Sequence, residues 1–174
     1  MKASVRIVLV DSHVMVRQAV RRLLEVEPGL IVCAEAETTE QVERALRRHH
    51  PDLVILDPSL QQDDGLTLIR VLRARFPALP ILILSLHKES LFAEATLRAG
   101  AQGYLMKNDA PDHLVHAVHE VSRGQIYVSE TIQQSIYAKV RQDALRRGGA
   151  PTTGALLSRH RPVAAHAYHA SQMH

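Results

Sequence analysis

The stretch Asp52–Asp57, DLVILD, places four consecutive apolar residues directly before a carboxylate. A short, continuous apolar run of this kind is typical of a strand that is buried on both faces of a parallel sheet. The stretch Val8–His13, VLVDSH, repeats the arrangement, because Asp11 follows an apolar run that begins at Val5. Two buried strands that each end in an acid are therefore predicted, and the rest of the chain can be interpreted around them.

Short apolar runs recur along the first 105 residues and alternate with amphipathic stretches. They predict five strands, at Val5–Val10, Leu30–Ala34, Leu53–Leu56, Ile81–Leu84 and Gly103–Leu105. The amphipathic stretches have apolar residues at helical spacing and end at turn signals such as Pro28-Gly29, Gly100 and Gly124. Five strands alternating with five helices predict an α/β fold, a three-layer sandwich with helices on both faces of a parallel five-stranded sheet.

Polar side chains stand at the carboxyl ends of these predicted strands, where open parallel sheets build their sites. The residues are Asp11, Asp57 and Ser85, which end the first, third and fourth strands, and Lys107, two residues after the fifth. Two neighbouring carboxylates repel each other unless a cation lies between them, and oxygen ligands suit Mg²⁺, which also binds phosphate oxygens. The set predicts phosphoryl transfer with Asp57 as the nucleophile and Lys107 as its ion-pair partner. The plainer alternative is that each Asp is a turn or cap residue.

Five motifs, found together and in order, resemble the receiver domain of bacterial two-component response regulators, specifically of the NarL/FixJ type. They are VLVDSH (Val8–His13), DLVILD (Asp52–Asp57), Asp64-Gly65, ILSLH (Ile83–His87) and AGAQGYLMK (Ala99–Lys107). The resemblance covers roughly residues 4–130. It implies a flavodoxin-like (βα)5 fold and transfer of a phosphoryl group from a sensor histidine kinase to Asp57.

The resemblance also implies site residues and partners. The implied Mg²⁺ ligands are Asp11, Asp57 and the backbone carbonyl of Ser59, and the phosphoryl-contact and switch residues are Ser85, Tyr104 and Lys107. Phosphorylation would draw Ser85 toward the new oxygens and bring Tyr104 inward. The altered surface, roughly Lys88–Gly124 by the family pattern, would bind a second copy of the chain or another protein. A chain of this kind is a reactant in phosphotransfer and not an enzyme with a turnover substrate.

Two positions depart from the family pattern. Receivers of this type usually have two adjacent acids after the first strand, but here Ser12 follows Asp11. A neutral hydroxyl is a weak ligand for a hard cation, so we expect weakened Mg²⁺ binding and reduced, but not abolished, phosphorylation of Asp57. Gln61 stands where a proline often shapes the loop. The departures leave open an alternative, a receiver that acts as an interaction module without being phosphorylated.

The sequence predicts three segments: a receiver domain at residues 1–128, a linker helix at 129–147 and a disordered basic tail at 148–174. NarL/FixJ-type regulators ordinarily end in a helix-turn-helix domain, which needs at least about 40 residues, more than the tail provides. The net charge of +3 hides a division, because residues 131–174 hold six Lys and Arg against one acid, Asp143. We nevertheless expect no sequence-specific DNA binding by this chain. A truncated transcription regulator, with its helix-turn-helix lost or out of frame, remains an alternative.

Other functional classes lack their defining residues. No GxGxxG follows the first strand and no GxxxxGK[ST] occurs, so a phosphate cradle for nucleotides is missing. Haloacid-dehalogenase-like phosphatases need a second Asp two residues after the nucleophile, where this chain has Ser59. His113, His116 and His119 drift around their helix, and no Cys or acid completes a tetrahedral metal set, so a solvated face is favoured.

Composition places the chain among soluble, intracellular proteins. The single cysteine, Cys33, rules out an internal disulfide. No apolar run reaches the length of a membrane span, and the first residues lack a signal-peptide pattern. We therefore expect a cytoplasmic location and no membrane partner.

Overall fold

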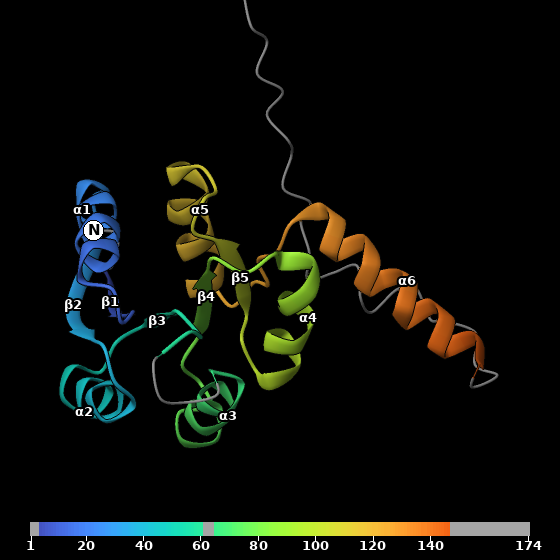
Figure 1. Ribbon diagram of the computed structural model, residues 1–174, viewed down its shortest axis with the longest axis horizontal. Coiled ribbons are helices and arrows are strands. Elements are labelled where there is room, and N and C mark those ends of the chain that lie inside the picture. Colours follow the sequence, from blue (N-terminus) through green and yellow to red (C-terminus); the bar gives the residue numbers. More distant parts are fainter. Residues whose placement is uncertain (1–3, 61–64, 147–174) are drawn as a thin grey trace, which may run out of the picture.

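The computed structural model describes residues 4–60 and 65–146. Strands and helices alternate along the chain (Figure 1). The elements are β1 (Val5–Val10), α1 (Val14–Val26), β2 (Leu30–Ala36), α2 (Thr39–His49), β3 (Leu53–Leu56), α3 (Gly65–Arg75), β4 (Ile81–Ser85), α4 (Glu89–Ala99), β5 (Gly103–Met106), α5 (Pro111–Ser122) and α6 (Glu130–Arg146). The predicted alternation of five strands and five helices is confirmed, and a further helix follows it.

All five strands form one parallel sheet in the order β2-β1-β3-β4-β5. The bounds of β1 and β3 match the prediction, whereas β2, β4 and β5 extend one or two residues further. The extensions remain in the ladder, since Val10 pairs with Ala36 and Ser85 pairs with Met106. Ser85 is fully buried despite its hydroxyl. The apolar run at β4 therefore stops one residue short of the strand end, because the last residue of that strand is polar but still paired.

The sheet is buried on both faces, as its apolar strands require. On one face, Val54 and Leu56 of β3 pack in a cluster with residues of α2, α3 and α4. On the other face, Leu53 and Ile55 pack with residues of α1 and α5. Figure 1 shows α1 and α5 on one side of the sheet and α2 and α3 on the other. The predicted three-layer sandwich is confirmed.

Close packing at β5 requires a residue without a side chain. A Cβ atom at Gly103 would lie 2.7 Å from Cδ1 of Leu82 and 2.9 Å from Cγ2 of Val121. Beside it, the segment after α5 returns to the sheet edge, where Tyr127 forms a parallel bridge with Gly103. The segment with this bridge lies directly before α6, which begins at Glu130.

Helix α6 packs against α4 (Figure 1). Ile132 is buried in the cluster on that face of the sheet, and Ile136 packs partly buried against it. Glu89 accepts a hydrogen bond from the backbone N–H of Ser129 at 2.8 Å, and Glu94 forms an ion pair with Lys139. The predicted linker segment 129–147 thus contains a helix that is attached to α4 by apolar and polar contacts.

Several predictions fall outside the part of the chain that the structure describes. They concern the loop at Gln61, where the family pattern often has a proline, and the disordered tail at 148–174. Within the described residues, no helix combines the length and apolar character needed to cross a membrane.

Candidate functional site

The fold brings together the polar side chains at the strand ends. Asp11 and Asp57 follow β1 and β3, which are neighbours in the sheet, and the backbone N–H of Asp57 donates to the carbonyl of Val10 at 2.8 Å. Across β4 and β5, the N–H of Lys107 donates to the carbonyl of Ser85, also at 2.8 Å. The predicted set therefore occupies one edge of the sheet because the strand register places it there.

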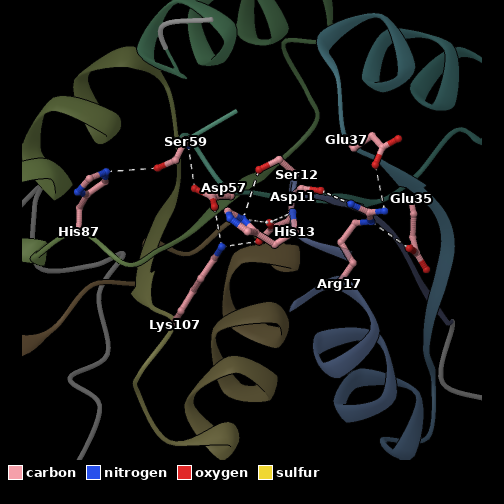
Figure 2. A network of polar contacts seen from close by, with 10 residues as sticks. All are labelled: Asp11, Ser12, His13, Arg17, Glu35, Glu37, Asp57, Ser59, His87 and Lys107. Carbon is pink, nitrogen blue, oxygen red and sulfur yellow. Dashed lines mark hydrogen bonds and ion pairs between the residues drawn. The ribbon is translucent and has the colours of Figure 1, made fainter. Parts of the chain in front are cut away.

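The Lys107 ammonium group lies between the two carboxylates (Figure 2). Its Nζ donates to Oδ2 of Asp57 at 2.6 Å and also to Oδ2 of Asp11. The exposed fractions of the three side chains are only 7% for Lys107, 3% for Asp11 and 5% for Asp57. The expected contact with Asp57 is present, and the contact with Asp11 is an addition. One ammonium compensates two buried carboxylates, which leaves one formal negative charge at the site.

The second oxygen of each carboxylate accepts a backbone hydrogen bond. Oδ1 of Asp57 accepts from the N–H of Ser59 at 2.8 Å, and Oδ1 of Asp11 accepts from the N–H of His13 at 2.7 Å. The imidazole Nδ1 of His13 lies 3.1 Å from the same Asp11 oxygen and 3.3 Å from Oγ of Ser12. Short turns after the strands thus fix the orientation of both carboxylates.

Among the described residues, Asp11, His13 and Asp57 form the group of side chains close enough to hold a metal ion. One ligand atom from each lies within 4.8 Å of the others. Carboxylate oxygens are the ligands that Mg²⁺ prefers, so the two acids fit the ion implied by the sequence. Ser12 directs its described hydrogen bond to His13. His13 was not among the metal ligands named from the sequence.

Ser85 and Tyr104 hold the same backbone segment, at His87. The Ser85 hydroxyl oxygen accepts from the N–H of His87 at 3.1 Å, and the Tyr104 hydroxyl donates to the His87 carbonyl at 2.8 Å. Burial raises the pKa of the Tyr104 phenol, against the opposing effect of the Ser85 hydroxyl. Tyr104 is only 1% exposed, so the structure describes its inward position. The inward movement expected on phosphorylation would have to start from another conformation.

Sequence reasoning missed a buried arginine beside the site. Arg17 is 8% exposed, and its guanidinium donates to the backbone carbonyl of Asp11 and to the carboxylates of Glu35 and Glu37. Burial acts to raise the pKa of Glu35, but hydrogen bonds from Arg21 and Arg17 outweigh it, and the pKa is lowered.

A sequence signal for this arginine exists. Arg17 precedes Val20 and Leu24 by three and seven residues, and these three are the buried positions of α1. A charged residue at helical spacing with two core residues indicates a buried charge, and a buried charge needs partners.

The three histidines of α5 do not form a metal cluster in the described part of the chain. The His116 ring makes an edge contact with Tyr127, with ring centroids 5.7 Å apart, and Nε2 of His119 lies 3.7 Å from Glu27. The rings of His116 and His119 thus contact residues other than one another.

Comparison with known proteins identifies the family. Residues 7–119 match the response regulator receiver domain. The transcriptional regulatory protein DegU of Brevibacillus brevis is 30% identical over 138 residues, which cover 79% of this chain and 58% of DegU. The response regulator UvrY of Escherichia coli K12 is 33% identical over 132 residues, covering 76% of this chain and 61% of UvrY. The chain thus spans about three fifths of the length of these curated relatives.

Solved structures agree with this assignment. A two-component response regulator of the LuxR family from Aurantimonas sp. SI85-9A1 is 37% identical, with a TM-score of 0.72, over 79% of this chain and 98% of that one. The isolated receiver domain of RcsB from Salmonella enterica serovar Typhimurium, solved with the phosphomimetic BeF3-, is 25% identical with a TM-score of 0.68, over 75% of this chain and 97% of that one. Together with the flavodoxin-like fold and the site at the strand ends, these likenesses show that the chain belongs to the response regulator receiver domains of the NarL/FixJ type.

Proposed function

We propose that this chain receives a phosphoryl group on Asp57 from the phosphohistidine of a sensor histidine kinase. The observation that carries the proposal is the Lys107 ammonium bound to both Asp11 and Asp57, with all three side chains buried. Such a fixed positive charge beside a carboxylate nucleophile stabilises the negative charge on a transferring phosphoryl group. In the step itself, a carboxylate oxygen of Asp57 forms a bond to phosphorus while the phosphorus–nitrogen bond of the donor breaks, and the imidazole leaves with that electron pair.

Other groups of the site orient Asp57, bind the phosphoryl group and hold the cation. The backbone N–H of Ser59 orients Asp57 by binding Oδ1, and Lys107 transfers one of its hydrogen bonds to the phosphoryl group. A divalent cation, held by Asp11, Asp57 and the backbone carbonyl of Ser59, supplies positive charge next to the phosphoryl oxygens when it is bound. Ser12 lowers the affinity of the site for Mg²⁺, because a neutral hydroxyl replaces a carboxylate.

The switch proposed for phosphorylation starts at Ser85. Its hydroxyl accepts from the N–H of His87, and turning to donate to a phosphoryl oxygen would release that backbone group. Of the two contacts with His87, only the hydrogen bond from Tyr104 would then remain on the loop between β4 and α4. Movement of this loop would alter the Lys88–Gly124 surface. We propose that this surface contacts a second copy of the chain or another protein in the cytoplasm, and that the chain by itself does not read a DNA sequence.

The test is labelling with a small phosphodonor, acetyl phosphate, with and without Mg²⁺, followed by intact-mass measurement. Wild-type protein and Asp112→Asn, an exposed acid at the start of α5, should gain one acid-stable, hydroxylamine-labile phosphoryl group. Asp57→Asn should gain none, and labelling of that variant overturns the assignment. Repeated release of phosphate from a phosphomonoester would favour a phosphatase instead.

One observation favours a second candidate, an interaction module that works without phosphorylation. Tyr104 lies inward and its hydroxyl is bound to the His87 carbonyl in the described conformation, which is the position expected of an activated receiver. If the Asp57→Asn protein retains full partner binding and output, this second function replaces the switch. Loss of output in that variant supports phosphotransfer.

A further inference from the structure

His13 lies beside Asp11, in the turn between β1 and α1 (Figure 2). Its backbone is extended, with φ −94° and ψ 107°, and its N–H is bound to Oδ1 of Asp11 at 2.7 Å. The imidazole Nδ1 approaches the same oxygen, at 3.1 Å. The turn therefore holds an imidazole nitrogen beside a carboxylate that faces the site.

The histidine side chain is accessible, whereas the acids are not. The His13 side chain is 62% exposed, against 3% for Asp11. Although His13 precedes the first residue of α1, its side chain makes no capping hydrogen bond to the helix. The ring thus does not cap α1, and it is exposed to solvent while contacting the buried Asp11 carboxylate.

The donor set differs in kind from one made of oxygen alone. Mg²⁺ is bound by carboxylates, carbonyls and water, and it relies on negative charge. With Lys107 in place, Asp11 and Asp57 offer only one net negative charge, and Ser12 adds none. The divalent first-row transition metals accept an imidazole nitrogen more readily than Mg²⁺ does, and they also accept carboxylate oxygen.

We propose that His13 is a further protein ligand of this site, beside Asp11, Asp57 and the backbone carbonyl of Ser59, and that the site consequently prefers a divalent first-row transition-metal ion such as Mn²⁺ to Mg²⁺. The proposal deepens the function proposed above and rests on it, because the role of the ion is to assist phosphoryl transfer to Asp57. It assigns His13 the place that Ser12 leaves without a carboxylate. The alternative is that His13 serves only as a hydrogen-bond partner of Asp11.

The test uses the full chain and Mn²⁺ alone, without a phosphodonor. Titration followed by the electron paramagnetic resonance signal of free Mn²⁺ gives the affinity, and competition with Mg²⁺ gives the preference. Wild-type protein should bind Mn²⁺ more tightly than Mg²⁺, and His13→Ala should weaken Mn²⁺ binding by at least about tenfold while changing Mg²⁺ binding less than twofold, by about 0.4 kcal/mol or less. The matched control is His113→Ala, which removes another exposed imidazole, at the first turn of α5, and should change neither affinity.

Electron spin-echo modulation of bound Mn²⁺ provides a direct readout of the ligand. We expect modulation from a coordinated ¹⁴N nucleus in wild type and in His113→Ala, and its loss in His13→Ala. Because the chain has eleven histidines, Asp57→Asn defines the site: a nitrogen signal that persists in that variant comes from elsewhere. Equal Mn²⁺ affinity in wild type and His13→Ala, or a nitrogen signal unaffected by either substitution, overturns the proposal.

Ser12→Asp distinguishes this proposal from the broader function. The added carboxylate should raise Mg²⁺ affinity by at least about tenfold and shrink the Mn²⁺ preference. If His13 proves irrelevant to metal binding but Asp57 is still phosphorylated with Mg²⁺, the ligand assignment fails and phosphotransfer stands. If Mn²⁺ binds through His13 but no phosphoryl group reaches Asp57, phosphotransfer fails and the ligand assignment stands.

Discussion

Replacing Lys107 with methionine tests the electrostatic core of the site. The substitution keeps an unbranched side chain but removes the ammonium group that binds Asp11 and Asp57. Both carboxylates are buried, with exposed fractions of 3% for Asp11 and 5% for Asp57. Removing one partner of a buried ion pair typically costs about 3–5 kcal/mol, because the remaining charge stays buried without compensation. We therefore expect Lys107→Met to lower the free energy of unfolding by about 3 kcal/mol at neutral pH.

The assay is urea unfolding followed by far-ultraviolet circular dichroism, with a chelator present so that no cation replaces the ammonium. Lys139→Met is the matched control, because Lys139 pairs with Glu94 where the side chains are 53% and 35% exposed. That exposed pair should cost less than about 1 kcal/mol. A loss below about 1 kcal/mol for Lys107→Met as well would refute the reasoning.

A second comparison keeps the prediction testable if Lys107→Met does not fold. Adding Asp57→Asn to it leaves one buried carboxylate instead of two, so the double variant should be more stable than Lys107→Met by about 1–2 kcal/mol. A double variant that is less stable than Lys107→Met would show that charge compensation is not what the lysine provides.

Three further outcomes are expected. Gly103→Ala should lower the free energy of unfolding by about 1–3 kcal/mol, because its Cβ would overlap Leu82 and Val121; an unchanged urea midpoint would contradict this packing. The pKa of Glu35 is lowered in the folded protein. The ionised carboxylate therefore stabilises the fold above the ordinary pKa of Glu, and this stabilisation is lost as the pH falls through the pKa of Glu35 in the folded protein. The stability difference between wild type and Glu35→Gln in urea titrations should accordingly shrink on acidification. Tyr104→Phe should lower the free energy of unfolding by about 1 kcal/mol, because the hydrogen bond to the His87 carbonyl is lost. Burial raises the pKa of Tyr104, so this variant should also lose a tyrosine that titrates at unusually high pH in ultraviolet absorbance.

The sheet and the contents of the site could be predicted because they depend on local patterns. A strand buried on both faces must be apolar throughout, and the runs at Val5–Val10 and Leu53–Leu56 identify β1 and β3 to the residue. Parallel strands bring their carboxyl ends to one edge, so the proximity of Asp11, Asp57 and Lys107 follows from the order of elements. The reasoning fell short at β2, whose last two residues, Glu35 and Ala36, remain paired although an acid interrupts the apolar run.

Contacts that depend on side-chain direction were not predictable in this way. The spacing of Arg17 in α1 indicates a buried charge, but its partners, Asp11, Glu35 and Glu37, lie outside the helix and become evident only when α1 is placed against the sheet. The packing of α6 on α4 depends on Glu94 and Lys139, which are 45 residues apart in the chain. Long-range pairs of this kind leave no periodic pattern in the sequence.

Because α6 is attached to α4, a movement of α4 can be transmitted along the length of α6. Glu89 and Glu94 of α4 hold the start and the middle of a helix of 17 residues, which at 1.5 Å per residue is about 25 Å long. If α6 follows α4 as one rigid body, a tilt of about 10° displaces the far end of α6 by about 4 Å, given that length. A small rotation of α4 would thereby be amplified into a displacement larger than a hydrogen bond at the far end of α6.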